Sequence, residues 1–260
     1  MWRTWEGESE RWLSTTAADR PADRIIDCLA YFGRRPKGGP SITPGELRRG
    51  LEQCGVERCA ALSLRGVYYD FREGNLETLK ASRDDSFIIP AATLDPRRFY
   101  GKADEELGLS NYRIMRVFPE VQGWPVDFAP FEKILQRAAA AGLPVMAPAQ
   151  GLGNATKLVR SAEKLGLTTV LTTVNYSNLS EVLALLSDND GLIVCIDMLN
   201  TPDGIELITD EFGPERLVFG SNFPDTYFHG PLIAVQRAEI SSIAKGKILR
   251  ENAARLLGIE

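Results

Sequence analysis

Eight short apolar runs alternate with amphipathic stretches along most of the chain, and this alternation limits the possible folds more than any other feature. The runs lie at residues 25–31, 58–64, 87–93, 113–118, 144–147, 168–174, 191–197 and 216–220. Repetition of strand and helix predicts right-handed crossovers and a parallel sheet. Eight units match an α/β fold of the (β/α)₈ TIM-barrel type in count and length. An open doubly wound sheet is the alternative, but the glycines of "GRRPKGGP" do not follow its G-x-G-x-x-G phosphate pattern.

Turn and capping residues separate these runs and mark where the intervening helices begin and end. In "TPGELRRGLEQCG", Thr43 is the expected N-cap, Glu46 completes a capping box, and Gly55 ends the helix. Similar signals, each with a glycine as the stop, lie at residues 131–142, 154–166 and 201–213. Amphipathic helices at these places are typical of an outer helical layer around a barrel.

Length and charge favour one barrel with a short extension. We expect residues 1–23 to form a polar N-terminal extension and residues 24–260 to form a single barrel. The net charge of −5 gives no footprint for nucleic acid or an anionic membrane, and basic clusters such as "GRRPK" are interpreted as solvated loops. No apolar run is long enough to span a membrane, and the charged start does not resemble a secretory signal. A cytoplasmic location is therefore expected.

Tryptophans and cysteines allow two further expectations. Trp2, Trp5 and Trp12 favour docking of the extension onto the barrel or onto another chain, so a homo-oligomer is one option. None of the four cysteines belongs to a C-x-x-C pair, and they are interpreted as buried, reduced thiols.

The C-terminal quarter carries the most specific pattern. The stretch from "LVFGSNFPD" to "NAARLLGI" resembles the end of the amidohydrolase-related family, where a strand ending in FGSD-x-P precedes a last helix that closes with N-A-x-R-L-L. "RIIDCLAYFG" resembles that family's I-I-D-x-H-x-H-x-G, and "GLPVMAP" resembles its G-L-P-V-x-x-H. The resemblance covers roughly residues 24–259. It implies a metal-dependent-hydrolase-like barrel, whose members hydrolyse or decarboxylate cyclic and carboxylate-bearing small molecules.

Histidine is the residue that this family's metal site needs, and this chain contains only one. The resemblance implies that imidazoles at the barrel mouth hold Zn²⁺ or a similar ion, which generates hydroxide from bound water. The corresponding positions here are Leu29, Tyr31, Pro148, near Thr173, and Asn222. These residue types bind zinc poorly or not at all. We therefore expect no catalytic metal and no other cofactor.

Polar and aromatic side chains are expected at the strand ends, where a barrel usually holds its ligand. These residues are Tyr31, Arg65, Tyr68, Asp95, Arg116, Gln150, Asn175, Asp197, Asn222 and Asp225. The candidates for contact with a small-molecule ligand are Tyr31, Arg116, Gln150, Asn175 and Asn222. Arg116 lies within an apolar run and needs a carboxylate partner, which is either Asp95 or Asp197 of the protein or an anionic ligand.

Three side chains are weak candidates for catalysis, and each has a structural alternative. Asp197 ends an apolar strand and either acts as a general base or caps the turn near "NTPDG". Asp225 has similar options, and His229 is either an ordinary loop histidine or a ligand contact above the mouth. Asp27 is expected to face away from Leu29 and to bond to backbone or to an arginine.

Three functions stay open at this point. The first is an amidohydrolase-related barrel that has lost its metal site and binds a small, potentially anionic molecule without metal-dependent hydrolysis. The second is a metal-independent hydrolase of a lactone, ester or similar bond, with an aspartate base and an arginine or tyrosine at the mouth. The third is a structural or oligomer-forming role. Whether the chain is an enzyme is therefore left undecided by its residues.

Overall fold

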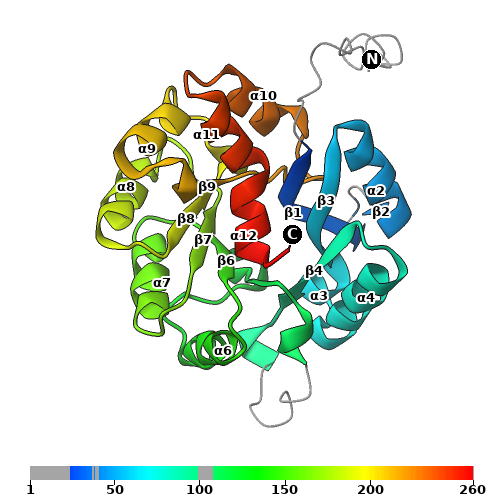
Figure 1. Cartoon of the computed structure of the whole chain (residues 1–260). Helices are drawn as coiled ribbons and strands as arrows, with labels where there is room; N and C mark the ends of the chain where they lie inside the picture. The colour runs from blue at the N-terminus through cyan, green and yellow to red at the C-terminus, as the bar shows by residue number, and fades with distance from the viewer. Residues whose placement is uncertain (1–23, 37, 39–40, 99–107, 260) are drawn as a thin grey trace, which may run out of the picture.

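Eight parallel strands follow one another around a curled sheet (Figure 1). The computed structural model describes residues 24–36, 38, 41–98 and 108–259, so the predicted extension with its tryptophans lies outside the described residues. The strands are β1 (Ile25–Arg34), β3 (Val56–Ser63), β4 (Ile88–Thr93), β5 (Ile114–Arg116), β6 (Val145–Pro148), β7 (Thr169–Thr172), β8 (Leu192–Cys195) and β9 (Leu217–Val218). Each overlaps one predicted run, and the TIM-barrel expectation is confirmed.

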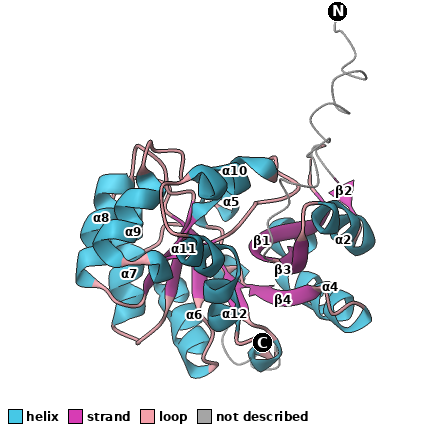
Figure 2. Cartoon of the chain, turned by 45° about the horizontal axis from the view of Figure 1, so that its top comes forward, coloured by secondary structure: helices cyan, strands magenta, loops and turns pink. Residues whose placement is uncertain are grey.

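Helices surround the sheet (Figures 1 and 2). They are α2 (Pro44–Gln53), α3 (Leu64–Tyr68), α4 (Phe71–Asp84), α5 (Pro119–Gln122), α6 (Ala129–Ala140), α7 (Asn154–Glu163), α8 (Leu179–Asp188), α9 (Gly204–Phe212), α10 (His229–Arg237), α11 (Ser242–Gly246) and α12 (Asn252–Leu257). The predicted capping box of α2 is present, because Thr43 Oγ1 accepts from the Glu46 N–H at 3.2 Å and the Glu46 carboxylate accepts from the Thr43 N–H at 2.7 Å. Helix α9 begins later than expected, since Asp203 first forms a left-handed turn with φ of 55°.

Apolar side chains form one layer inside the barrel and another between sheet and helices. Ile89, Met146 and Val218 belong to the inner layer, which also includes Leu257 of α12. Figure 1 shows α12 lying across one end of the barrel. A short strand, β2 (Ser41–Ile42), pairs antiparallel with the end of β1. No helix in the described ranges is both long enough and apolar enough to cross a membrane.

A bulge in β1 decides which of its side chains enter the barrel. Between Asp27 and Ala30 the register against β3 shifts, because three steps along β1 match two steps along β3. Leu29 and Tyr31 consequently join the inner apolar layer, as expected. Without the bulge, strict alternation would place Asp27 on the same face as Leu29.

Asp27 holds this bulge together and links β1 to the strand that closes the barrel. One carboxylate oxygen accepts from the Leu29 N–H at 2.9 Å and from the Ser221 N–H at 3.0 Å, while the other accepts from the Ser221 hydroxyl. The main chain completes the closure, since the Tyr31 N–H donates to the Phe223 carbonyl at 3.0 Å. The expected backbone bonding of Asp27 is confirmed, and burial raises its pKa to about 6.

The seam between β1 and β9 gives a first prediction, about the Ser221 hydroxyl. Ser221→Ala should lower the free energy of unfolding by roughly 1–3 kcal/mol, because a buried carboxylate loses a hydrogen bond. Ser187→Ala, in the exposed last turn of α8, is the matched control and should change it by less than about 0.5 kcal/mol. Urea unfolding at pH 7 measures both values. Equal, small effects of the two variants would show that Asp27 does not depend on Ser221.

Candidate functional site

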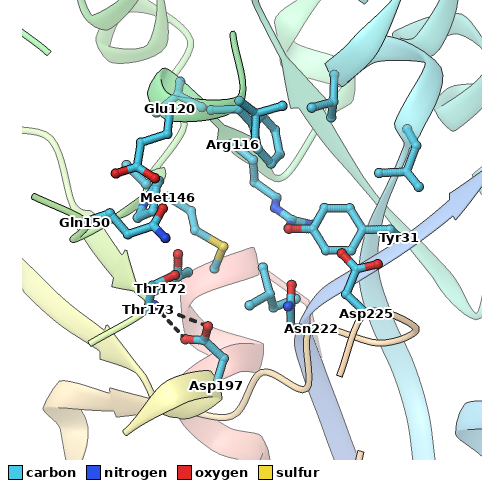
Figure 3. Close-up of a pocket in the computed structure, with 18 of the residues that line it drawn as sticks. Tyr31, Arg116, Glu120, Met146, Gln150, Thr172, Thr173, Asp197, Asn222 and Asp225 are labelled. Atoms are coloured by element: carbon cyan, nitrogen blue, oxygen red, sulfur yellow. Dashed lines mark hydrogen bonds between the residues drawn. The ribbon is translucent and has the colours of Figure 1, made fainter. Parts of the chain in front are cut away.

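A cavity of about 180 Å³ lies at the strand ends, with walls from β1, β5, β6, β7 and the segments after β8 and β9 (Figure 3). All five positions that the resemblance assigns to metal ligands line it, namely Leu29, Tyr31, Pro148, Thr173 and Asn222. Most of the expected mouth residues lie there too: Tyr31, Tyr68, Arg116, Gln150, Asp197, Asn222 and Asp225. The volume is below the roughly 300–1,000 Å³ of typical pockets, which suits a small ligand.

Arg116 places a positive charge in the wall of this cavity. The residue ends β5 and is 2% exposed. The guanidinium carbon lies 4.1 Å from the centroid of the Tyr31 ring and 5.7 Å from that of Phe118. Nη1 donates to the Ala30 carbonyl at 2.9 Å, whereas Nη2 is buried without an acceptor. The aromatic faces stabilise the cation, but part of its hydrogen-bonding capacity is unused.

Of the two alternatives for Arg116, the ion pair with a protein carboxylate is not formed. Asp95 binds Arg97 instead, whose Nε and Nη2 donate to its oxygens at 3.0 and 2.8 Å. Because Asp95 and Arg97 are two residues apart, this pairing closes a much shorter loop than a bond to Arg116 would. Asp197 makes no ion pair with Arg116 either, and no carboxylate in the described ranges lies within 4.0 Å of the Arg116 guanidinium.

Asp197 faces the same cavity from the segment after β8 and is 7% exposed. Both of its carboxylate oxygens accept from the Thr173 N–H, at 3.1 and 3.2 Å (Figure 3). The alternative that Asp197 caps the turn near "NTPDG" is therefore wrong. Its carboxylate instead binds the backbone N–H of Thr173, just after the end of β7. Burial raises the pKa of Asp197 to about 7, so this carboxyl gains and loses a proton near neutral pH.

Two residues in the cavity wall have a left-handed backbone. Thr173 has φ of 59° and Asn222 has φ of 56°. This conformation is unusual for any residue with a side chain and most unfavourable for a β-branched one such as Thr173. It costs on the order of 1–3 kcal/mol, and such strain clusters at functional sites. At Thr173 this conformation accompanies the N–H contact to the Asp197 carboxylate.

A second arginine at the rim was missed by the sequence reasoning. Arg35 forms an ion pair with Asp225, and its Nη1 donates to the Tyr68 hydroxyl at 3.0 Å. Arg35 belongs to "GRRPK", so the interpretation of this cluster as a solvated loop is wrong for this residue. Glu120 and Met146 also line the cavity and were missed. Their positions in the sequence could have identified them, because Glu120 follows the end of β5 and Met146 lies within β6.

Four of the expected residues lie outside the cavity lining, namely Asn175, His229, Arg65 and Asp95. The Asn175 amide donates to the Thr173 carbonyl at 3.1 Å and shapes the turn before α8. His229 begins α10 and packs edge-on against Phe228, with ring centroids 6.0 Å apart. Arg65 donates to Glu77 at 2.8 Å on the outside of the barrel. Asp95, the partner of Arg97, is likewise absent from the lining.

The side chains at the five family positions do not suit a metal ion. Leu29 and Pro148 carry no ligand atom, and two other positions offer only neutral hydroxyl or amide oxygens. Burial raises the pKa of the Tyr31 phenol, which keeps it protonated. The Arg116 cation beside Tyr31 would also repel a second cation. In the part of the chain that the structure describes, no three His, Cys, Asp or Glu side chains group together as a metal site would require.

The raised pKa of Asp197 gives a prediction about stability against pH. Between its ordinary value of 3.8 and about 7, the folded state holds this proton more tightly than the unfolded chain, so stability falls as pH rises through this window. Asp197→Asn should make that fall shallower, by at most about 1.4 kcal/mol per pH unit. Urea unfolding at pH 4, 5.5 and 7 tests this, with exposed Asp188→Asn as control. A wild-type slope in Asp197→Asn would contradict the assignment.

Solved structures with this fold include decarboxylases and a hydrolase. The 5-carboxyvanillate decarboxylase of Sphingomonas paucimobilis aligns with a TM-score of 0.71 and 14% identity, over 91% of this chain and 99% of that chain. The 2,6-dihydroxybenzoate decarboxylase from Rhizobium aligns with a TM-score of 0.70 and 12% identity, over 91% and 99%. A Pseudomonas putida protein provisionally named a 2-pyrone-4,6-dicarboxylic acid hydrolase aligns with a TM-score of 0.72 and 19% identity, over 91% and 98%. These identities are low, so the alignments show a shared fold.

The sequence itself gives the family. No curated protein sequence matches this chain. A family model described as amidohydrolase matches residues 14–259, which is nearly the whole chain and includes every strand of the barrel. This match confirms the resemblance found at the strand ends and in the last helix: the chain belongs to the amidohydrolase family.

Proposed function

We propose that this barrel binds a small carboxylate-bearing molecule at its mouth and does so without a metal ion. The observation that carries the proposal is the buried Arg116 guanidinium, which lines the cavity and has no carboxylate partner among the described residues. A buried charge without a counterion is costly. A ligand carboxylate relieves that cost through charge-assisted hydrogen bonds. Gln150 and Asn222 supply further polar groups around such a ligand.

The names of the structural relatives support a carboxylate ligand. Carboxyvanillate, dihydroxybenzoate and pyrone-dicarboxylic acid are all small ring compounds that carry at least one carboxyl group. The apolar part of this cavity, formed by Leu29, Phe118 and Met146, suits a ring of that size. A shared fold does not transfer a substrate, so the argument for this chain depends on its own Arg116.

The metal-free part of the proposal depends on charge. In a metal-dependent barrel the ion supplies the positive charge at the mouth. Here a guanidinium lies 4.1 Å from the ring of Tyr31, one of the positions that the family resemblance assigns to a ligand. We take Arg116 as the cation that a ligand carboxylate meets in this barrel.

Loss of the Arg116 charge tests this function. Arg116→Met should weaken the binding of benzoate roughly 10–100-fold, because hydrogen bonds to charged groups contribute about 1.5–3 kcal/mol. The melting temperature should not fall, since the variant replaces an unpaired buried charge with an apolar chain of similar length. Isothermal titration calorimetry measures affinity, and Arg65→Met, outside the cavity, is the matched control. Unchanged benzoate affinity in a folded Arg116→Met protein would contradict the proposal.

A second candidate function is favoured by Asp197. This carboxyl faces the cavity, and its pKa of about 7 suits a general base that takes a proton from water at neutral pH. The water attacks the carbonyl of a lactone or ester, and the Arg116 cation stabilises the oxyanion that develops. Collapse of this oxyanion breaks the acyl C–O bond, and the proton that Asp197 took from water passes to the leaving alkoxide. The result is a metal-independent hydrolase that uses the same cavity.

A comparison of turnover and benzoate binding between the wild type and Asp197→Asn distinguishes the two candidate functions. If the protein hydrolyses a carboxylate-bearing lactone or ester, Asp197→Asn should lower kcat by at least about 100-fold, in line with the loss of a general base, while benzoate still binds. The assay is run on the wild type, on Asp197→Asn and on the Asp188→Asn control. Equal turnover in all three proteins would exclude Asp197 as the base, and binding without any turnover would leave only the first function.

A further inference from the structure

Exposed apolar side chains gather at the mouth end of the barrel. Nine large apolar side chains are exposed among the described residues, and five of them lie one each in the segments that follow β5, β6, β7, β8 and β9. These strands are hydrogen-bonded neighbours in that order, and residues of all five segments line the cavity, so the segments lie next to one another around its mouth. We call this set the mouth patch, and its members are Val121, Leu152, Tyr176, Met198 and Tyr227.

Three members of the mouth patch are the most exposed large apolar side chains of the described residues. Tyr227 is 94% exposed, Tyr176 79% and Leu152 78%, so these side chains contribute almost nothing to the core of this chain. Single apolar residues at a surface are common, but several on one face typically mark a site of interaction. With about 150–250 Å² for a whole aromatic residue, the five side chains expose on the order of 600 Å².

The loops that carry Tyr176 and Leu152 are held by hydrogen bonds from the beginning of α8. Oδ1 of Asn178 accepts from the Asn175 N–H at 2.8 Å, and its Nδ2 donates at 2.8 Å to a carbonyl of the loop after β6. Glu181 accepts at 2.9 Å from the backbone N–H that follows Leu152. An exposed side chain on a loop that is already ordered loses little freedom when it binds, which suits it to anchor a partner.

The loops around the mouth patch carry very little charge. Charged residues make up 25% of the chain, yet residues 149–153 and 173–178, which form the loops after β6 and β7, contain none. The loop between β9 and α10 contains only Asp225, which is paired with Arg35. Few charges together with exposed tyrosine and methionine are typical of the centre of a protein–protein interface.

We propose that the mouth patch is the contact surface of a homodimer, in which a second copy of this chain meets it across a two-fold axis. In such a contact each patch meets its own copy, so a charged patch would face like charges whereas an uncharged patch does not. The net charge of −5 on each copy therefore favours contact through this face. With on the order of 600 Å² from each copy, the contact reaches the roughly 1,000 Å² that a specific interface needs.

Sedimentation velocity of the full-length chain, from about 1 to about 200 μM, tests the dimer. The wild type should reach twice the mass of one chain at the upper end of this range. Tyr176→Ser should raise the dissociation constant at least about tenfold, because tyrosines are common hot spots and each substitution acts twice in a dimer. Ile243→Ser, at a site of similar exposure on α11, is the matched control and should leave the dissociation constant unchanged.

A second matched pair adds charge to the contact. Leu152→Glu places one negative charge from each copy in the interface and should also raise the dissociation constant at least about tenfold, because like charges oppose association. Leu76→Glu makes the same change at an exposed leucine of α4, outside the mouth patch, and should behave as the wild type. Both leucines are exposed, so neither substitution should lower the melting temperature appreciably.

Two results would overturn the proposed dimer. The first is a wild-type chain that stays monomeric at about 200 μM, which is also the result expected if residues 1–23 or another protein covers the mouth patch. The second is a dimer that Tyr176→Ser and Leu152→Glu weaken no more than Ile243→Ser and Leu76→Glu do. Sedimentation needs no ligand, so the dimer and the carboxylate-binding function can each fail without the other.

Discussion

A positive charge buried at the barrel mouth is the constraint to which the rest of this site responds. The Arg116 guanidinium is held by one hydrogen bond to the Ala30 carbonyl and by the face of the Tyr31 ring. Both of these contacts come from the bulged part of β1. The bulge is in turn fixed by Asp27, whose carboxylate bonds to β1 and to Ser221 after β9. The closure of the barrel and the position of its mouth cation therefore depend on the same few residues.

This arrangement is consistent with the proposed metal-free site and with the residues at the positions that the resemblance assigns to metal ligands. Once a guanidinium occupies this part of the mouth, a divalent ion beside it is opposed by charge repulsion. The Tyr31 ring stabilises the cation through its aromatic face. The carboxylate that faces the cavity also comes from a different strand end than the family pattern implies. The family pattern implies an aspartate where Asn222 stands, whereas here Asp197 faces the cavity from the neighbouring strand.

The fold could be predicted from the sequence because its signals are local. Each strand has its own apolar run, and the capping box of α2 lies within four residues. The errors arose where long-range pairing decides the outcome. Asp95 and Asp197 were equally good partners for Arg116 on sequence grounds, yet a nearby Arg97 takes the first. The ion pair of Arg35 with Asp225 joins residues at opposite ends of the chain, and no periodicity marks it.

The cation at the barrel mouth is the central claim, and metal content tests it most directly. The protein is purified without chelators, incubated with Zn²⁺ or Mn²⁺, passed through a desalting column, and measured by inductively coupled plasma mass spectrometry. With Arg116 as the resident cation, well under one equivalent of either metal per chain is expected. One tightly held equivalent that disappears in Asp197→Asn would place a metal at the mouth and contradict this account.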